Sequence, residues 1–112
     1  MLRVLHGDLV AAARTLHAAP PAQRDALLRR MLVAADLADR HRRRQGRPHP
    51  HYGTGSLMAS AQRWPQRPEP FLDDPDYLEC LARVIAALRA RIRRKQGTRA
   101  TMARMPEADR LS

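Results

Sequence analysis

Apolar residues recur with helical spacing along most of the chain, most regularly between Asp73 and Gly97. Intervals of three and four residues separate Leu78, Leu81, Ile85, Leu88 and Ile92. This a/d pattern predicts a long amphipathic helix whose apolar seam packs against a partner helix. We expect Asp74 as its N-cap, Pro75 as its first residue and Gly97 as its stop, a length of about 33 Å.

Two earlier helices are predicted in the N-terminal half. The first follows an N-cap at Asp8 and ends at Pro20-Pro21, because the residue before a proline avoids the helical region. The second runs from this proline pair to about Arg44. It carries a broad apolar stripe, and Gly46 is its expected C-terminal cap.

The middle of the chain is rich in Gly and Pro, which predicts loops. Residues 46–56 form one loop, and Ser56 can cap a short third helix that ends near Arg63. Trp64 follows and is expected to dock on the core. Residues 65–75 contain four prolines, so this segment is predicted to be extended.

These elements predict an all-α fold, a small bundle of three to four helices with one long C-terminal amphipathic helix. Residues 1–96 form a single helical domain, and residues 97–112 are expected to be a flexible tail. A chain of 112 residues with one Phe, one Trp and two Tyr can bury only a modest core. We therefore expect self-association into a homo-oligomer to complete the packing.

The charge of the chain bears on its possible partners. The net charge is +10, and twenty of the 21 basic residues are arginines. Such a balance favours a polyanionic partner, which is nucleic acid, an anionic membrane surface or an acidic protein. A GC-rich coding sequence is an alternative explanation for part of the arginine content. Asp36 precedes Arg40 and Asp39 precedes Arg43 by four positions, which favours ion pairs along the second helix.

The basic residues gather near the C-terminal ends of the two long predicted helices. One cluster comprises Arg40, Arg42, Arg43, Arg44 and Arg47, and the other comprises Arg89, Arg91, Arg93, Arg94, Lys95 and Arg99. The clusters lie at opposite ends of the molecule if the helices are antiparallel and merge if they are parallel. Arginine matches phosphate geometry, and without aromatic residues nearby we expect salt-sensitive contacts to the nucleic-acid backbone. Alternatively, both clusters are solvated ends that offset the helix dipoles.

Two segments contain residue types that occur in ligand-binding sites, but their sequence context favours a structural role. His41, His49 and His51 lie within eleven residues, yet zinc sites usually need three or four ligands that include Cys or a carboxylate, and the single Cys80 is distant. We expect these histidines to be polar loop residues with backbone partners. The Gly-Thr-Gly-Ser run at residues 53–56 lacks the lysine and the preceding strand of a phosphate-binding loop, so a helix cap is favoured.

Asp73, Asp74 and Asp76 could bind Mg²⁺, but a helix start explains them as caps. No nucleophile and base stand in a recognisable pattern, so we expect no enzyme, no cofactor and no metal. The lone Cys80 excludes a disulfide framework and is expected to be buried. No apolar run is long enough to span a membrane and no signal-peptide pattern is present, which favours a cytoplasmic, bacterial-type protein with no membrane contact.

Three motifs in order are Leu5-His6-Gly7-Asp8, Gly55-Ser56-Leu57-Met58 and Asp73-Asp74-Pro75-Asp76-Tyr77. Over about residues 4–92 the chain resembles a family of short alphaproteobacterial proteins with no assigned activity. It also resembles, more distantly, the small terminases of phage-like gene transfer agents. That second resemblance implies a ring-forming helical adaptor that delivers DNA to a large-terminase partner, although the first two predicted helices show no clear recognition helix.

The function predicted from sequence is that of a non-enzymatic, self-associating helical adaptor in DNA packaging. Its non-specific nucleic-acid contacts are assigned to Arg40, Arg42, Arg43, Arg44, Arg47, Arg91, Arg93, Arg94 and Lys95. The seam residues are assigned to packing and oligomerisation. The alternative is a small regulator whose basic ends dock on an acidic protein.

Overall fold

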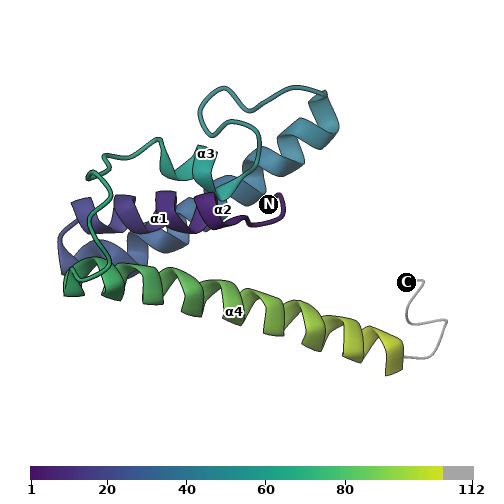
Figure 1. Ribbon diagram of the computed structural model, residues 1–112. Coiled ribbons are helices and arrows are strands. Elements are labelled where there is room, and N and C mark those ends of the chain that lie inside the picture. Colours follow the sequence, from purple (N-terminus) through teal and green to yellow (C-terminus); the bar gives the residue numbers. More distant parts are fainter. Residues whose placement is uncertain (105–112) are drawn as a thin grey trace.

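The computed structural model describes residues 1–104 and is built from helices (Figure 1). These are α1 (His6–Ala18), α2 (Arg24–Gln45), α3 (Leu57–Ala61) and α4 (Pro75–Arg104), with a short 3-10 turn, η1 (Pro21–Gln23), ahead of α2. Residues 1–104 contain no strand, only one isolated bridge between His49 and Gly53. The predicted all-α class with a long C-terminal helix is confirmed.

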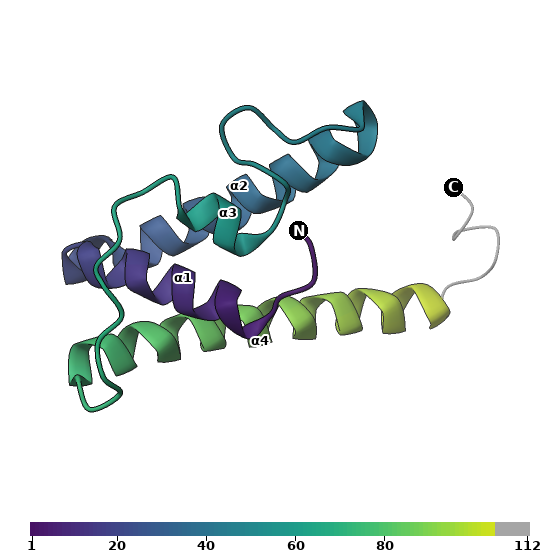
Figure 2. The ribbon, with the colours of Figure 1, turned by 45° about the horizontal axis from the view of Figure 1, so that its top comes forward.

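Helix α1 lies at the centre of the arrangement (Figures 1 and 2). It packs against α4 on one side and against α3 on the other, and α3 also contacts α2. The C-terminal end of α1 meets the start of α4, where His17 lies 3.5 Å from Asp76. The segment before α1 lines a groove with Leu88 and Ile92 of α4, so α1 and α4 are antiparallel.

Three of the predicted helix caps are confirmed. The Ser56 hydroxyl accepts the backbone N–H of Ala59 at 3.0 Å, and the Asp74 carboxylate accepts that of Tyr77 at 3.0 Å. Gly46 ends α2 in the left-handed conformation, with φ of 71°. These local signals fix the start of α3, the start of α4 and the end of α2.

The predicted N-cap at Asp8 is wrong, because α1 begins at His6 and its N-cap residue is Leu5. Asp8 instead lies in the first turn, where its carboxylate accepts the backbone N–H of Leu5 at 2.7 Å. Its other oxygen accepts the backbone N–H of Met58 at 2.8 Å. One buried carboxylate therefore satisfies the starts of both α1 and α3, a tertiary role that the local sequence does not reveal.

The predicted stop at Gly97 is also wrong, because α4 continues to Arg104. A glycine inside a helix costs about 1 kcal/mol relative to alanine, and the helix-compatible residues on both sides outweigh this penalty. The part of the predicted tail at residues 97–104 is therefore helical. Residues 105–112 of that tail lie outside the described part of the chain.

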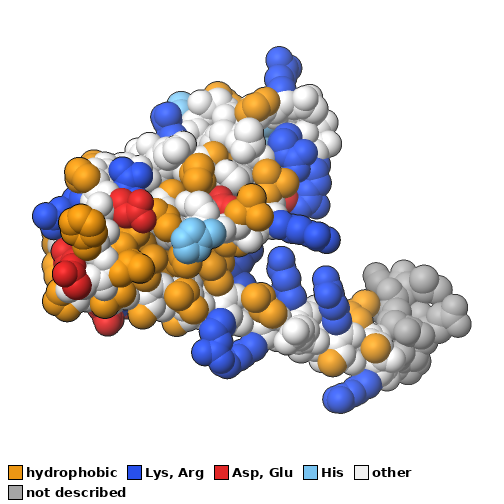
Figure 3. All heavy atoms as spheres, viewed as in Figure 1, with side chains coloured by type: hydrophobic (Ala, Val, Ile, Leu, Met, Phe, Trp, Pro, Cys, Tyr) orange, Lys and Arg blue, Asp and Glu red, His pale blue; other side chains and the backbone are white. Residues whose placement is uncertain are grey.

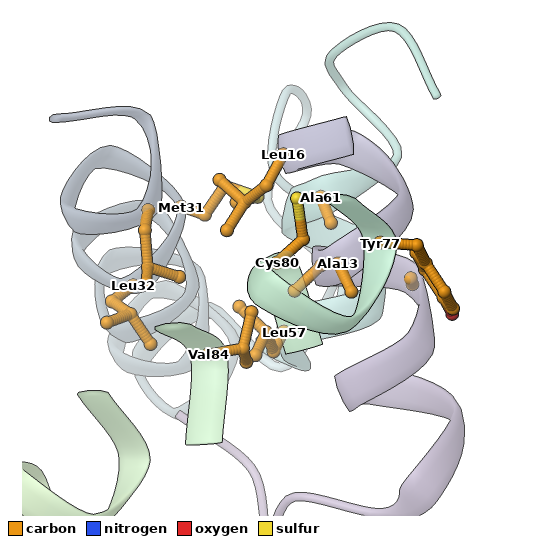
Figure 4. Close-up of a cluster of buried hydrophobic side chains, with 12 residues drawn as sticks. Ala13, Leu16, Met31, Leu32, Leu57, Ala61, Tyr77, Cys80 and Val84 are labelled. Carbon is orange, nitrogen blue, oxygen red and sulfur yellow. The ribbon is translucent and has the colours of Figure 1, made fainter. Parts of the chain in front are cut away.

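Side chains from all four helices meet in one small core (Figure 4). From α4 it receives Tyr77, Cys80 and Val84, which are spaced three and four residues apart and are fully buried. Alanines from α1 and α3 occupy part of the rest, which lets the helix backbones approach closely. Trp64 packs on the edge of this core, as predicted, and Cys80 is buried, as expected.

The predicted seam of α4 divides into two sets within the chain. Leu81 and Leu88 are half-buried and pack against the core. Leu78, Ile85 and Ile92 are exposed, with 44% of the side chain of Ile85 accessible. The buried face of α4 is thus rotated from the predicted seam toward Cys80 and Val84.

Three ion pairs join α2 to α4 and set their relative direction. They are Arg24–Asp76, Arg83–Asp25 and Arg91–Asp36, with shortest N···O distances of 2.6, 2.6 and 2.9 Å. Because the residue numbers rise together along both helices, α2 and α4 run parallel. The two helices then diverge toward their C-terminal ends (Figures 1 and 2).

The rotation of α4 predicts opposite outcomes for two adjacent substitutions. Val84→Asp places a carboxylate in the core, which costs several kcal/mol, a large part of the roughly 5–15 kcal/mol that stabilises a small domain. We expect this variant to be unfolded by circular dichroism at 25 °C. Ile85→Asp should keep the helical spectrum and a cooperative melt at low protein concentration. Equal destabilisation of the two variants would contradict the observed packing face.

Candidate nucleic-acid interface

The first basic cluster extends from the last turns of α2 into the following loop, and its members differ in what they contact. Arg42 and Arg43 both pair with Asp39 on the same helix, as predicted for Arg43. Arg42 also donates to the backbone carbonyl of Thr54 at 3.0 Å, which ties the loop to the helix. Arg40, Arg44 and Arg47 are exposed and make no ion pair within residues 1–104.

The second cluster lies on the part of α4 that projects beyond the core. Arg91 is held by Asp36 of α2 and is only 18% exposed at its side chain. Asp36 was expected to pair with Arg40, and the structure pairs it with Arg91 instead. The remaining members are exposed along the helix: Arg89, Arg93, Arg94, Lys95 and Arg99.

Asp39 anchors the α2 cluster from inside the protein, with only 1% of the residue exposed. The hydrogen bond from Arg43 holds the pKa of Asp39 well below its usual range, against the opposing effect of burial, and the Met1 amino group and Arg42 add to it. Gly55 packs directly on this residue, because a Cβ there would lie 2.7 Å from the Asp39 backbone. The buried carboxylate thus fixes the arginines and the loop together.

The neighbouring Asp36 links the two clusters. Burial raises its pKa, but hydrogen bonds from Arg91 and from the Met1 amino group outweigh burial, and the pKa is lowered overall. Asp36 and Asp39 therefore both remain ionised in the folded protein. They hold Arg42, Arg43 and Arg91 close together between α2 and α4.

The parallel course of α2 and α4 brings both basic clusters to the same end of the molecule. Figure 3 shows most of the visible Lys and Arg side chains toward that end and most of the visible Asp and Glu side chains toward the opposite end. The acidic end contains Asp25, Asp76 and Glu79, which pair with Arg83 and Arg24. Of the alternatives left open by the sequence, the structure selects the parallel one.

The three histidines lie side by side. The ring centroids of His41 and His49 are 5.0 Å apart, and those of His49 and His51 are 6.0 Å apart. The Nδ1 atom of His49 accepts the backbone N–H groups of His51 and Tyr52, which are the backbone partners expected from the sequence. Burial lowers the pKa of His49, and His41 and His51 lower it further. No three His, Cys, Asp or Glu side chains within residues 1–104 form a metal-binding group.

The remaining candidate segments serve as structural caps. Ser56 caps α3 and Gly55 packs against Asp39, so the Gly-Thr-Gly-Ser turn is part of the scaffold. Asp74 caps α4, and Asp76 binds Arg24, a guanidinium that is only 3% exposed. This hydrogen bond lowers the pKa of Asp76. Arg24 was not singled out from the sequence, because nothing local distinguishes it from the exposed arginines.

The fold and these contacts define a class, a small all-α protein with a long C-terminal helix and arginine-rich helix ends. A family model described as a domain of unknown function (DUF7742) matches residues 2–88, so the chain belongs to this family. No curated protein and no solved structure matches it. The match ends before most of the basic residues of α4. Within the described residues, no helix is both long and apolar enough to cross a membrane.

The membership confirms the resemblance at the level of a family with no assigned function. The alphaproteobacterial origin and the likeness to small terminases stay predictions.

The low pKa values of the aspartates predict loss of stability in acid. A carboxylate with its ordinary pKa of 3.8 when unfolded and a lower pKa when folded stabilises the protein above pH 3.8. This contribution is lost as the pH falls below that value. The melting temperature of the wild type should therefore fall steeply as the pH drops below about 4, because the unfolded chain then binds protons that the folded carboxylates do not.

Replacing Asp39 tests this assignment. Asp39→Asn should destabilise the protein at pH 7 by about 2–3 kcal/mol, because it removes the negative charge that pairs with Arg42, Arg43 and the Met1 amino group. Its melting temperature should also depend less on acid than that of the wild type. Asp73→Asn, at an exposed position, is the control. An unchanged acid profile in Asp39→Asn would rule out Asp39 as the main titrating group.

Proposed function

We propose that the protein is a non-enzymatic helical adaptor that self-associates and contacts the phosphate backbone of nucleic acid with the basic ends of α2 and α4. The observation that carries this proposal is that both clusters lie toward the same end, where Asp36 and Asp39 are the nearby acids and are already paired with arginines. A rod of negative charge would meet both clusters at once on that end. Separate clusters at opposite ends would each contact it more weakly.

The distribution of acidic residues supports this proposal. Residues 40–68 contain no Asp or Glu, and neither do residues 80–106. The few acids near the clusters, Asp36 and Asp39, are already committed to Arg42, Arg43 and Arg91. The exposed arginines therefore keep their charge available for an outside anion.

The expected recognition is of charge, with no reading of base sequence by these two clusters. Guanidinium groups bind phosphate oxygens with two parallel hydrogen bonds, and each neutralised phosphate releases condensed counterions. Such binding falls steeply with salt. The proposal assigns no helix to the reading of a groove, because the sequence of the first two helices shows no clear recognition helix.

Self-association rests on the exposed part of the α4 seam. Leu78, Ile85 and Ile92 are seven residues apart, so they form one stripe along the helix, and each is at least 44% exposed. These are the a positions of the predicted heptad, one of the two positions that form the seam of a helix pair, while the d residues Leu81 and Leu88 pack within the chain. A second copy of α4 is the partner that we propose for it.

In its finer form, the proposal is a small-terminase-like component of DNA packaging that binds a large-terminase-type partner. The helical fold, the basic end and the stripe for self-association support it, together with the distant resemblance of the sequence. The competing proposal is a regulator whose basic end docks on an acidic protein. Binding to duplex DNA separates the two.

Duplex binding gives the first test. A labelled 20-bp duplex should bind the wild type at low salt, with log K falling linearly with log salt concentration in fluorescence anisotropy. Arg94→Glu should weaken this binding and reduce the salt slope by about one, because one phosphate contact is lost. Arg63→Glu makes the same change in net charge outside both clusters and should have a smaller effect. Absence of duplex binding at low salt would favour the acidic-protein partner.

Light scattering gives the test of self-association. The wild type should have a mass of two or more chains at micromolar concentration, and Ile85→Asp should be a folded monomer, because a charge in the seam is costly to bury. Phe71→Asp alters a residue that is 88% exposed outside α4, and it should leave the mass unchanged. A monomeric wild type would refute self-association through α4.

A further inference from the structure

A row of aromatic rings lies beside the outer face of α2, which the sequence did not predict. The rings of His41, His49, Tyr52 and Trp64 follow one another. Their centroids are separated by 5.0, 5.1 and 6.5 Å in that order. The Tyr52 ring is nearly parallel to both His49 and Trp64, with interplanar angles of 24° and 15°. Arg30 of α2 completes the row, with its guanidinium carbon 5.6 Å from the centroid of Trp64.

Two hollows adjoin this row, and Leu37 borders both. The first, of about 470 Å³, is lined by Tyr52 and Trp64, by the apolar side chain of Val33 and by Arg29 and Arg30 at α2. The second, of about 390 Å³, is lined by His41, His49, Arg40 and Arg44. No acidic side chain lines either hollow.

The rings of His41, His49, Tyr52 and Trp64 and the arginines beside them lie along α2, and together we call them the track. From Arg30 to Arg44 the helix rises about 21 Å, with Arg29 and Arg30 at one end of this length and Arg40 and Arg44 at the other. All four rings are half-buried, so they are held in place and still reach the surface. The far end of the track coincides with the exposed arginines of the α2 cluster.

The chemistry of the track limits the class of ligand that it can bind. Flat apolar rings favour flat apolar groups, while the arginines at both ends of the row favour anions. A single strand of nucleic acid carries both, because its bases expose their faces and its phosphates follow one another along the backbone. Aromatic side chains in a basic groove are how proteins bind single strands without reading their sequence. A duplex cannot use the rings, because its bases already stack on one another.

We propose that this track binds single-stranded nucleic acid, with bases stacked against Tyr52 and Trp64 and phosphates on Arg29, Arg30, Arg40 and Arg44. The proposal deepens the proposed function and rests on it only for the shared arginines, Arg40 and Arg44. The ring contacts are separate from the charge contacts made with a duplex.

Trp64 is the single tryptophan of the chain, so its fluorescence reports directly on this site. Full-length protein is titrated with dT12 and, separately, with U12, and each strand also carries a label for anisotropy. Both strands are pyrimidine homopolymers with the same phosphates, and they differ in the 2′-hydroxyl group and in the 5-methyl group of thymine. Quenching of Trp64 that follows the anisotropy curve of either strand supports the proposal. Quenching by neither strand overturns it.

Variants at Tyr52 separate stacking from charge. Tyr52→Leu keeps an apolar side chain but removes the ring, and it should weaken binding of the strand roughly tenfold or more. The slope of log K against log salt should stay the same. Tyr52→Phe should restore binding, and Phe71→Leu, which removes a ring elsewhere, should have no effect. Equal affinity of Tyr52→Leu and the wild type would overturn the proposal, provided that both have the same helical spectrum.

The outcomes also separate this proposal from the proposed function. If the protein binds the duplex, and also binds single strands without quenching of Trp64, the single-strand track is refuted and the proposed phosphate-backbone interface is kept. Quenching by dT12 without any duplex binding would keep the track and overturn the duplex interface. If Tyr52→Leu fails to fold, the alternative test is acrylamide quenching of Trp64 in the wild type. Bound dT12 should reduce this quenching, and unchanged quenching would count against the track.

Discussion

The arrangement depends on the ion pairs that hold α4 parallel to α2. The core alone is thin and rich in alanine, and a smooth apolar surface of this kind leaves the direction of a packed helix weakly specified. The pair between Arg24 and Asp76 supplies that direction. Arg24 is almost fully buried, so its guanidinium needs both oxygens of the carboxylate, and only one placement of the start of α4 provides them.

This constraint has an electrostatic consequence. Each long helix has one acid in its first turn, Asp25 in α2 and Asp76 in α4, and ends in bases, an order that also suits the helix dipole. Running the two helices parallel adds their charge asymmetries, whereas an antiparallel pair would cancel them. The molecule therefore has an acidic end, where charges neutralise one another, and a basic end. Within the basic end, Asp36 and Asp39 hold three arginines rigidly and leave the others exposed.

Much of the fold follows from local signals, and the sequence therefore predicted it. Asp74 and Pro75 mark the start of α4, and Ser56 and Gly46 mark two other boundaries, since each acts on its nearest backbone groups. The wrong predictions concern features that depend on tertiary contacts. Asp8 was assigned to one helix start but satisfies two, and the buried face of α4 is set by what α1 and α2 offer to Val84 and Cys80. The order of hydrophobic residues along one helix cannot reveal this.

The candidate site divides in the same way. The basic clusters are evident in the sequence, but their common location depends on helix direction, which no residue pattern specified. The aromatic row was also invisible, because Tyr52 and Trp64 belong to separate loops and the chain brings them together only by returning across α2. Long-range contacts of this kind require the fold.

The distance between a label directly before α2 and labels on α4 tests the parallel arrangement most directly. Spin labels at Gln23→Cys and Ala82→Cys, with the buried Cys80 replaced by alanine, should be clearly closer together than labels at Gln23→Cys and Gln96→Cys, as measured by pulsed electron resonance. This order of distances means that both helices start at the same end. The reverse order, with Gln96 nearer to Gln23 than Ala82 is, would mean that the helices are antiparallel and that the basic ends lie apart.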